Sequence, residues 1–66
     1  MQLTGNGRAS DVPDGTDLPA LLDSLGLRVG SVVVEHNGTA LLRSELPGVA
    51  LRDGDRLELV RAVAGG

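Results

Sequence analysis

One segment of the chain has its hydrophobic residues spaced as in an α-helix. Four leucines recur at positions i, i+3, i+4 and i+7, and they are Leu18, Leu21, Leu22 and Leu25. Thr16 or Asp17 can cap the beginning of this helix with a side-chain oxygen, and Pro19 is tolerated in its first turn. Gly26 can end it. The pattern predicts one helix of about two and a half turns, with a leucine face turned toward the core.

The remaining hydrophobic residues follow the pattern of short β-strands separated by turns. The turn signals are Asn6-Gly7, Asn37-Gly38 and Asp53-Gly54. Such pairs suit type I′ turns, because both central residues of that turn need a positive φ. The expected strands adjoin these turns and span residues 2–5, 8–12, 31–36, 39–43 and 56–62. The chain therefore has one helix between two hairpins, and one last strand.

These elements predict a two-layer α+β domain, in which one helix packs on one face of a mixed four- or five-stranded sheet. Residues 44–49 are expected to be irregular, and residues 11–17 to form a turn into the helix rather than a domain boundary. No repeat or low-complexity linker interrupts the chain. We expect one domain over residues 1–62, followed by a flexible C-terminal tail of residues 63–66.

The composition indicates how so small a domain is stabilised. The 66 residues include 12 Leu and 8 Val but no Cys, Lys, Ile or aromatic residue, and only one His. Disulfides and a multi-ligand metal site, which stabilise many small domains, are therefore excluded. Leucine and valine together make up 20 of the 66 residues, which is enough for a folded chain with an aliphatic core.

The charge of the chain excludes further classes of partner. Six Arg and nine acidic residues give a net charge of −3, and no basic run is present. Because basic patches and aromatic stacking carry most nucleic-acid binding, we expect no nucleic-acid partner. No apolar stretch is long enough to span a membrane, and the N-terminal residues have no signal-peptide pattern. We therefore expect a soluble cytoplasmic protein without a membrane partner.

The residue types needed for catalysis are nearly absent, and we predict no catalytic or metal-binding residue. Nucleophilic catalysis requires an activated Ser, Thr, Cys or Lys beside a base, and the one His, His36, is expected to be an exposed strand end beside a turn. Asp53 and Asp55 flank Gly54, and they are interpreted as turn residues that bond nearby backbone N–H groups rather than as an acid pair or calcium site. Gly5-Asn6-Gly7 lacks the other parts of a phosphate-binding loop.

The C-terminal run Ala62-Val63-Ala64-Gly65-Gly66 carries the one chemical feature that stands out. Terminal glycines add no packing, and one interpretation is a frayed end without a role. Because glycine has no side chain, an extended Gly-Gly tail can also enter a channel too narrow for a Cβ. The Gly66 carboxylate is ionised at pH 7 and resists nucleophilic attack. A partner enzyme must therefore activate it, for instance as an acyl-adenylate.

Several motifs together resemble the ThiS family, the small sulfur carriers of thiamine biosynthesis. The similarity extends over essentially the whole chain, and it rests on Val32–Gly38, Leu42–Ser44, Leu51–Val60 and Ala62–Gly66. It implies the ubiquitin-like β-grasp fold. Arg43 matches a position that is commonly basic in the family. Two features depart from the family: Leu42 stands where relatives often have a proline, and the exposed sheet face has no aromatic residue.

The resemblance implies a role for the tail and a set of partners. An adenylating enzyme that uses ATP and Mg²⁺ would activate the Gly66 carboxylate, and a sulfur donor such as a cysteine desulfurase would convert it into a thiocarboxylate. Gly65, Ala64 and Val63 would thread into the partners' active sites, and a thiazole synthase would receive the sulfur. The chain would bind no cofactor itself and act as a protein co-substrate rather than an enzyme. Because it has no Cys, the sulfur must come from another protein.

The last expected strand supplies candidate docking residues. Leu57 and Leu59 alternate along it with Glu58, Val60 and Ala62, and the second set should face outward. We expect these three residues to form a partner-docking patch with Val60 at its centre.

Two other functions fit the same tail. The chain is alternatively a sulfur carrier for molybdopterin or cysteine synthesis, although Ala62-Val63-Ala64 lacks the proline that often precedes Gly-Gly in molybdopterin carriers. It is alternatively a ubiquitin-like protein modifier. Without Lys it cannot form isopeptide chains on itself, but conjugation to other proteins stays open.

Overall fold

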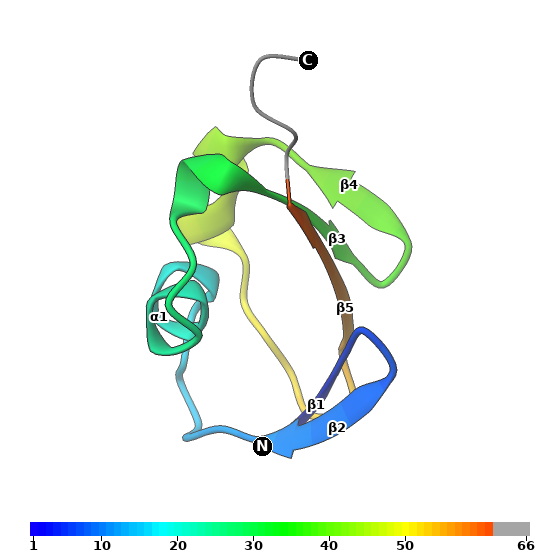
Figure 1. Ribbon diagram of the computed structural model, residues 1–66. Helices are drawn as coiled ribbons and strands as arrows, with labels where there is room; N and C mark the ends of the chain where they lie inside the picture. The colour runs from blue at the N-terminus through cyan, green and yellow to red at the C-terminus, as the bar shows by residue number, and fades with distance from the viewer. Residues whose placement is uncertain (62–66) are drawn as a thin grey trace.

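The computed structural model describes residues 1–61, which form a five-stranded sheet with an α-helix on one face (Figure 1). The strands are β1 (Gln2–Gly5), β2 (Arg8–Asp11), β3 (Val32–His36), β4 (Thr39–Leu41) and β5 (Arg56–Arg61), and the helix is α1 (Leu18–Ser24). Two 3₁₀ helices lie in the connections, η1 (Val29–Ser31) and η2 (Arg43–Gly48). The five predicted strands and the predicted helix are therefore confirmed.

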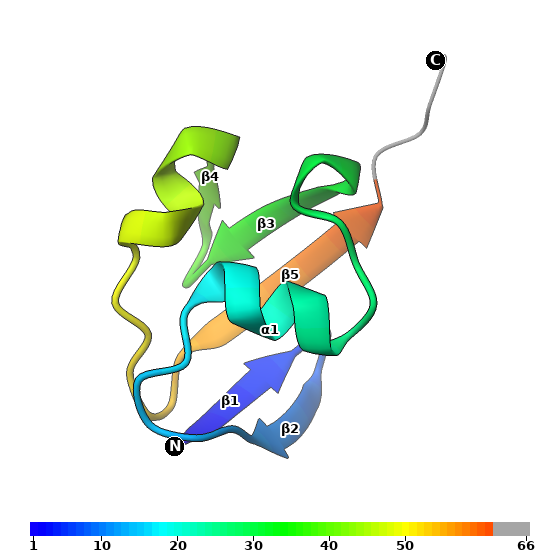
Figure 2. The ribbon, with the colours of Figure 1, turned by 90° about the vertical axis from the view of Figure 1, so that its left-hand side faces the viewer.

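The first and last strands lie side by side in the middle of the sheet. The strand order is β2-β1-β5-β3-β4, with β5 parallel to β1 and antiparallel to β3. One hairpin therefore flanks β5 on each side. The helix α1 crosses one face of this mixed sheet (Figure 2), which gives the predicted two-layer α+β architecture.

Both ends of α1 are fixed by capping interactions. The Asp17 carboxylate accepts a hydrogen bond of 2.9 Å from the backbone N–H three residues later, and this satisfies one of the free donors of the first turn. At the other end Gly26 has a φ of +74°, and the Leu27 N–H donates to the Leu22 carbonyl at 2.8 Å. This Schellman pattern turns the chain, so that Leu27 packs against the core.

Leu25 is the exception in the predicted leucine face. Leu18 and Leu22 are fully buried, whereas Leu25 is 56% exposed. The helix ends at Ser24, so Leu25 has the non-helical dihedral angles of a cap residue and its side chain leaves the helical period. The expectation that all four leucines face the core was wrong for this last one.

The two Asn-Gly pairs form the predicted type I′ turns. The two φ angles are 49° and 81° in Asn6-Gly7, and 49° and 87° in Asn37-Gly38. In Asp53-Gly54 only the glycine has a positive φ, of 88°, so the prediction of a type I′ turn was wrong there. That turn leads from a loop into β5 and does not join two paired strands, so it need not match the twist of a hairpin.

Residues 44–49, expected to be irregular, belong largely to η2. Leu46 is only 2% exposed and adds to the core. The Glu45 carboxylate accepts a hydrogen bond of 2.7 Å from the Leu42 N–H and so fixes the start of this helix. A single buried leucine produces no period along the sequence, which is why the hydrophobic pattern did not reveal this element.

The core consists entirely of aliphatic side chains, as the composition predicted. It draws on β1, α1, β3, η2 and β5, and its buried members are Leu3, Leu18, Leu21, Leu22, Val32, Val34, Leu46 and Leu57. Within residues 1–61, none of the helices is long and apolar enough to cross a membrane.

The contrast between two leucines of the α1 region tests this core. We expect Leu22→Ala to lower the free energy of unfolding by about 3 kcal/mol, because it leaves a cavity under the helix. Leu25→Ala removes an exposed side chain and should cost less than about 1 kcal/mol. Urea denaturation of both variants measures the difference. Equal losses of stability would show that Leu25 is part of the core in solution.

Candidate functional site

The last strand of the structure, β5, leads to the predicted tail. The tail residues Val63, Ala64, Gly65 and Gly66 lie outside the described residues, as does Ala62, the last residue of the predicted domain. The described chain ends at Arg61, which pairs with Val32 at the last rung of the β3–β5 ladder. The candidate site therefore consists of β5 and the surfaces on its two sides.

The asparagines of the two hairpin turns both hold β5. The Arg56 N–H donates to Asn37 Oδ1 at 2.8 Å, and the Asn37 N–H donates to the Arg56 carbonyl at 2.8 Å. Further along the strand, the Leu59 N–H donates to Asn6 Oδ1 at 2.8 Å, and Asn6 Nδ2 donates to the Leu59 carbonyl at 3.1 Å. Each asparagine side chain thus adds hydrogen bonds between its hairpin and the backbone of β5. The sequence identified both residues as turn formers but gave no sign of this second role.

Side chains of β5 alternate between the two faces of the sheet. Leu57 is buried beneath α1, while Glu58 and Val60 are exposed on the opposite side, which we call the open face. The outward direction predicted for these two residues is confirmed. Their part in docking stays a prediction, and the third expected docking residue, Ala62, lies outside the described residues.

Pairing between β3 and β5 adds two residues that the sequence did not reveal. Val33 lies opposite Val60, and Glu35 lies opposite Glu58. The two valines are 47% and 55% exposed. The open face therefore carries an apolar pair beside an acidic pair. Only the register of two distant strands brings these residues together, since a run of three valines does not say which of them faces solvent.

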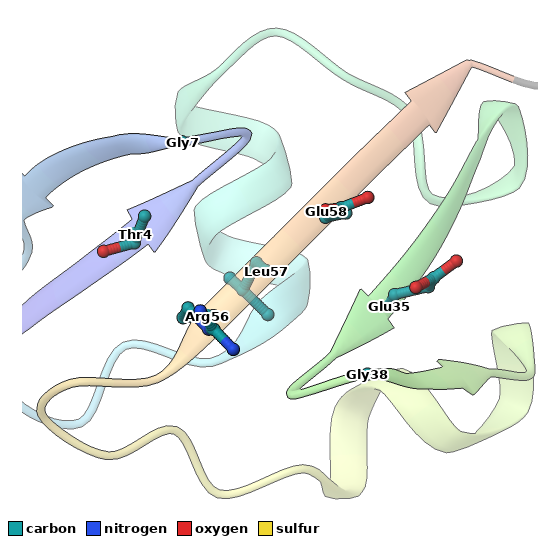
Figure 3. A pocket seen from close by; sticks show the side chains of 7 residues that line it. All are labelled: Thr4, Gly7, Glu35, Gly38, Arg56, Leu57 and Glu58. Atoms are coloured by element: carbon teal, nitrogen blue, oxygen red, sulfur yellow. The ribbon is translucent and has the colours of Figure 1, made fainter.

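A hollow of about 340 Å³ lies on the open face around the acidic pair (Figure 3). Glu35 and Glu58 project from neighbouring strands, and Arg56 and Thr4 line the hollow beside them. Two like charges directly opposite each other destabilise an antiparallel pair. Arg56 contributes one positive charge to the hollow against the two glutamates, which leaves a net negative charge there. This face is therefore suited to a partner with a basic side chain.

His36 is half-buried and hydrogen-bonded, so the prediction of an exposed strand end was wrong. Its Nε2 lies 2.8 Å from Asp55 Oδ2, and Asp55 is only 9% exposed. Asp55 also accepts hydrogen bonds from Asn37 Nδ2 at 3.1 Å and from the Arg52 N–H at 2.9 Å. Since an ionised carboxylate can only accept, the imidazole Nε2 is the donor. The network ties the β3–β4 turn to the loop before β5.

The three donors also set the acidity of Asp55. Burial acts to raise its pKa, but the hydrogen bonds from His36, the Arg52 backbone and Asn37 outweigh burial and lower the pKa from 3.8 to about 2. The bond from the Arg52 N–H is the local turn contact that the sequence predicted.

Asp53 and Asp55 do not form an acid pair. Asp53 accepts a hydrogen bond from the backbone N–H of Gln2 in β1, away from the His36–Asp55 contact. No group of three or more potential metal ligands occurs among residues 1–61. Both aspartates therefore act as structural acceptors around β5.

Arg43 has a packing contact within the fold. A Cβ added at Gly30 in η1 would lie 3.1 Å from Arg43 Nη1, so the guanidinium occupies the space that a side chain at this glycine would need. The contact joins the start of η2 to η1. Arg43 therefore has a structural role in the fold, at a position that is commonly basic in the family.

The lowered pKa of Asp55 predicts a pH-dependent stability. Because the folded-state pKa lies below the ordinary value, the ionised carboxylate stabilises the fold above pH 3.8, and this contribution disappears as the pH falls to about 2. We expect Asp55→Asn to cost about 2 kcal/mol at pH 7, since an amide cannot accept from all three donors. The difference from the unaltered protein should shrink between pH 3.8 and about 2.

Urea denaturation at a series of pH values measures this difference. Asp23→Asn, which neutralises an exposed carboxylate of α1, is the control and should change stability by less than about 0.5 kcal/mol. A cost for Asp55→Asn that stays constant down to pH 2 would contradict the assigned role.

Comparison with known sequences identifies relatives along the entire chain. The ThiS family model matches residues 1–66. The chain is 36% identical to a thiazole synthase of Paramagnetospirillum magneticum over 66 residues, which are 100% of this chain but only 20% of that protein. It is 38% identical over 53 residues to the sulfur carrier protein ThiS of Thermus thermophilus, and the match covers 80% of this chain and 83% of the relative.

Comparison with solved structures gives the same family. The crystal structure of the thiamine biosynthesis protein ThiS from Geobacter metallireducens has a TM-score of 0.81 and 36% identity, with 100% of both chains covered. The solution structure of a thiamine biosynthesis protein from the same organism has a TM-score of 0.78 and 33% identity, over 100% of this chain and 88% of the other. The chain thus belongs to the ThiS family and has its ubiquitin-like β-grasp fold.

Proposed function

We propose that this protein, a sulfur carrier of thiamine biosynthesis, accepts and donates sulfur through the carboxylate of Gly66. The observation that carries the proposal is the match to the ThiS family over residues 1–66, which includes the final Gly65-Gly66. The relative from Thermus thermophilus bears the name of a sulfur carrier protein. The absence of Cys further favours sulfur carriage on a carboxyl group rather than on a thiol. The proposal takes Gly66 as the last residue of the functional protein.

The proposed chemistry has two steps. A Gly66 carboxylate oxygen attacks the α-phosphorus of ATP on an adenylating enzyme, and pyrophosphate leaves. Sulfide then attacks the carbonyl carbon, and AMP leaves with the carboxylate oxygen. Where the donor is the persulfide of a cysteine desulfurase, its terminal sulfur attacks in the same way, and a thiol then reduces the S–S bond of the resulting acyl disulfide and releases the thiocarboxylate. One oxygen is thereby replaced by sulfur, and the product is a thiocarboxylate. ATP and Mg²⁺ belong to the adenylating partner in this proposal, and the carrier is a protein co-substrate.

The tail can serve this chemistry because it follows a well-anchored strand. β5 is paired on both sides, and the side chains of Asn6 and Asn37 bond to its backbone. An extended residue spans at most about 3.5 Å, so five residues beyond Arg61 reach at most about 17 Å. An enzyme that acts on Gly66 must therefore touch the surface around the end of β5. Val63, Ala64 and Gly65 would form the segment that threads its active site.

The open face is the proposed docking surface for the adenylating enzyme. Val33 and Val60 form its exposed apolar centre, and Glu35 and Glu58 lie beside them. Apolar side chains surrounded by polar groups are typical of protein–protein contacts. The complementary partner surface would present an apolar side chain for the valines and a basic side chain for the two glutamates.

A thiazole synthase is the proposed acceptor of the sulfur. The thiazole synthase of Paramagnetospirillum magneticum contains a segment similar to the whole of this chain, within a protein about five times as long. One polypeptide that bears the name thiazole synthase thus contains a segment similar to this carrier. This supports a partnership between this separate carrier and a thiazole synthase of the same pathway.

Thiocarboxylate formation is tested by intact mass. Incubation with the cognate adenylating enzyme, ATP, Mg²⁺ and sulfide should raise the mass by one oxygen-to-sulfur exchange. Deletion of Gly66 should abolish the change and leave the thermal midpoint nearly unaltered, because a glycine has no side chain to pack in a core. An unchanged mass in the presence of a demonstrably active enzyme would overturn the proposal. The mass of the untreated protein establishes whether Gly66 is its last residue.

Loss of the gene separates this function from its alternatives. A thiamine requirement is the expected phenotype. A requirement for molybdenum cofactor or cysteine instead would assign the carrier to another pathway, and covalent linkage of Gly66 to lysines of other proteins would make it a modifier.

The docking surface is tested by two matched substitutions. Val60→Ser should weaken binding to the adenylating enzyme by about tenfold, since it removes part of the apolar centre. Leu25→Ser makes a similar change at a residue that is 56% exposed on the helix side of the sheet, and should leave this binding unaltered. Calorimetric titration of both variants gives the affinities. Equal effects of the two substitutions would remove the open face from the interface.

A further inference from the structure

A second hollow lies on the helix side of the sheet, near the end of β5. It has a volume of about 550 Å³, and its lining residues come from the tip of the β1–β2 hairpin, the end of α1 and the chain after it, and strands β3 and β5. Figure 2 shows how these elements are arranged. We call it the Leu25 groove. Its apolar lining comes from Leu25, Leu27, Val32 and Leu59, and it also includes the two arginines Arg8 and Arg61.

The groove exists because the helical layer covers the inner side of β5 over only part of its length. Leu57, the first inward-facing residue of β5, is 2% exposed, but the next inward positions are a half-buried Leu59 and an exposed Arg61. The helix α1 ends at Ser24, and strand β1 pairs with β5 only as far as Leu57. Beyond that point, residues 1–61 do not completely cover the inner side of β5.

Leu25 is exposed at this place because α1 ends just before it. Its side chain is 56% exposed, although its sequence position continues the spacing of the buried leucines. The Schellman motif after Ser24 turns Leu27 inward and leaves the Leu25 side chain at the edge of the groove. A large aliphatic side chain beside other apolar lining residues forms a surface that gains from burial against a partner.

Two positive charges accompany this apolar surface in a protein of net charge −3. Arg8 lies at the start of β2 and Arg61 at the end of β5, and both line the groove. The ion pairs within residues 1–61 are those of the terminal amine with Asp14 and of His36 with Asp55, so neither arginine is neutralised by a described carboxylate. Guanidinium groups favour bidentate pairing with carboxylates. The charge of the groove is thus opposite to that of the acidic pair on the open face.

We propose that the Leu25 groove docks an acidic segment of the sulfur-accepting enzyme. The segment would place an aliphatic side chain on the floor of the groove, and an Asp or Glu between Arg8 and Arg61. This inference rests on the proposed function, because it assigns the groove to an enzyme that uses the tail. Charge complementarity gives the chemistry of the segment, because two arginines line the groove. The open face is the surface proposed for the adenylating enzyme, so the groove is assigned to the other enzyme that uses the tail. Two partners of the same tail can then recognise different sides of β5.

Three variants and one control test the groove. Arg8→Gln and Arg61→Gln each remove one positive charge from it, and Leu25→Ala removes apolar surface at little expected cost in stability. Arg52→Gln removes the same charge from an exposed residue in the loop before β5, outside the groove. For each protein we would measure thiocarboxylate formation by intact mass, and affinity for the cognate thiazole synthase and for the adenylating enzyme by calorimetric titration.

We expect each groove variant to lower the affinity for thiazole synthase by about tenfold, with a smaller salt dependence for the two arginine variants. For Arg8→Gln and Leu25→Ala, which lie outside β5, thiocarboxylate formation and affinity for the adenylating enzyme should stay within about twofold of the unaltered protein. The Arg52→Gln control should behave like the unaltered protein in all three measurements.

Other outcomes would overturn the proposal in distinguishable ways. Unaltered affinity for thiazole synthase in all groove variants would show that the groove is not its docking site. Loss of affinity for the adenylating enzyme alone would assign the groove to that partner instead. A concentration-dependent dimer that Leu25→Ala abolishes, measured by sedimentation, would identify a second copy of the chain as the occupant. If the unaltered protein forms no thiocarboxylate, the proposed function fails, while the titration with thiazole synthase still tests the groove.

Discussion

The fold depends on how β5 is held in the middle of the sheet. β5 joins two hairpins that come from opposite ends of the chain, with β1 on one side and β3 on the other. Hydrogen bonds from the side chains of Asn6 and Asn37 extend both contacts. Ladder hydrogen bonds satisfy the backbone of β5 on both sides. β5 is also the strand that leads to the tail proposed to carry sulfur.

A polar network complements the small aliphatic core. Asp55 is the one buried charged residue among those described, and it receives hydrogen bonds from His36, Asn37 and the Arg52 backbone. A domain of this size buries limited apolar surface and has no disulfide to restrain it. Fixing the loop before β5 with a carboxylate of low pKa therefore helps to secure this strand, which contacts the core through Leu57 and the partly buried Leu59.

The alternation of β5 gives the two sides of one strand different recognition chemistry. Glu58 and Val60 lie on the open face beside their partners from β3, whereas Leu59 and Arg61 lie on the helix side at the groove. In the proposed function, the carrier presents the same tail to two enzymes. Surfaces of opposite charge on the two sides of the strand that leads to the tail provide a physical basis for telling those enzymes apart.

The sequence by itself determined the helix, five strands, two type I′ turns and the aliphatic core, because local spacing and turn chemistry encode them. It also identified the ThiS family through Gly65-Gly66 and the motifs before it. Only the tertiary structure decided the His36–Asp55 bond, the Val33–Val60 and Glu35–Glu58 pairs, and the exposure of Leu25. These features depend on strand register and on where one layer stops covering another. Both are set by contacts between residues far apart in the chain, which no local pattern records.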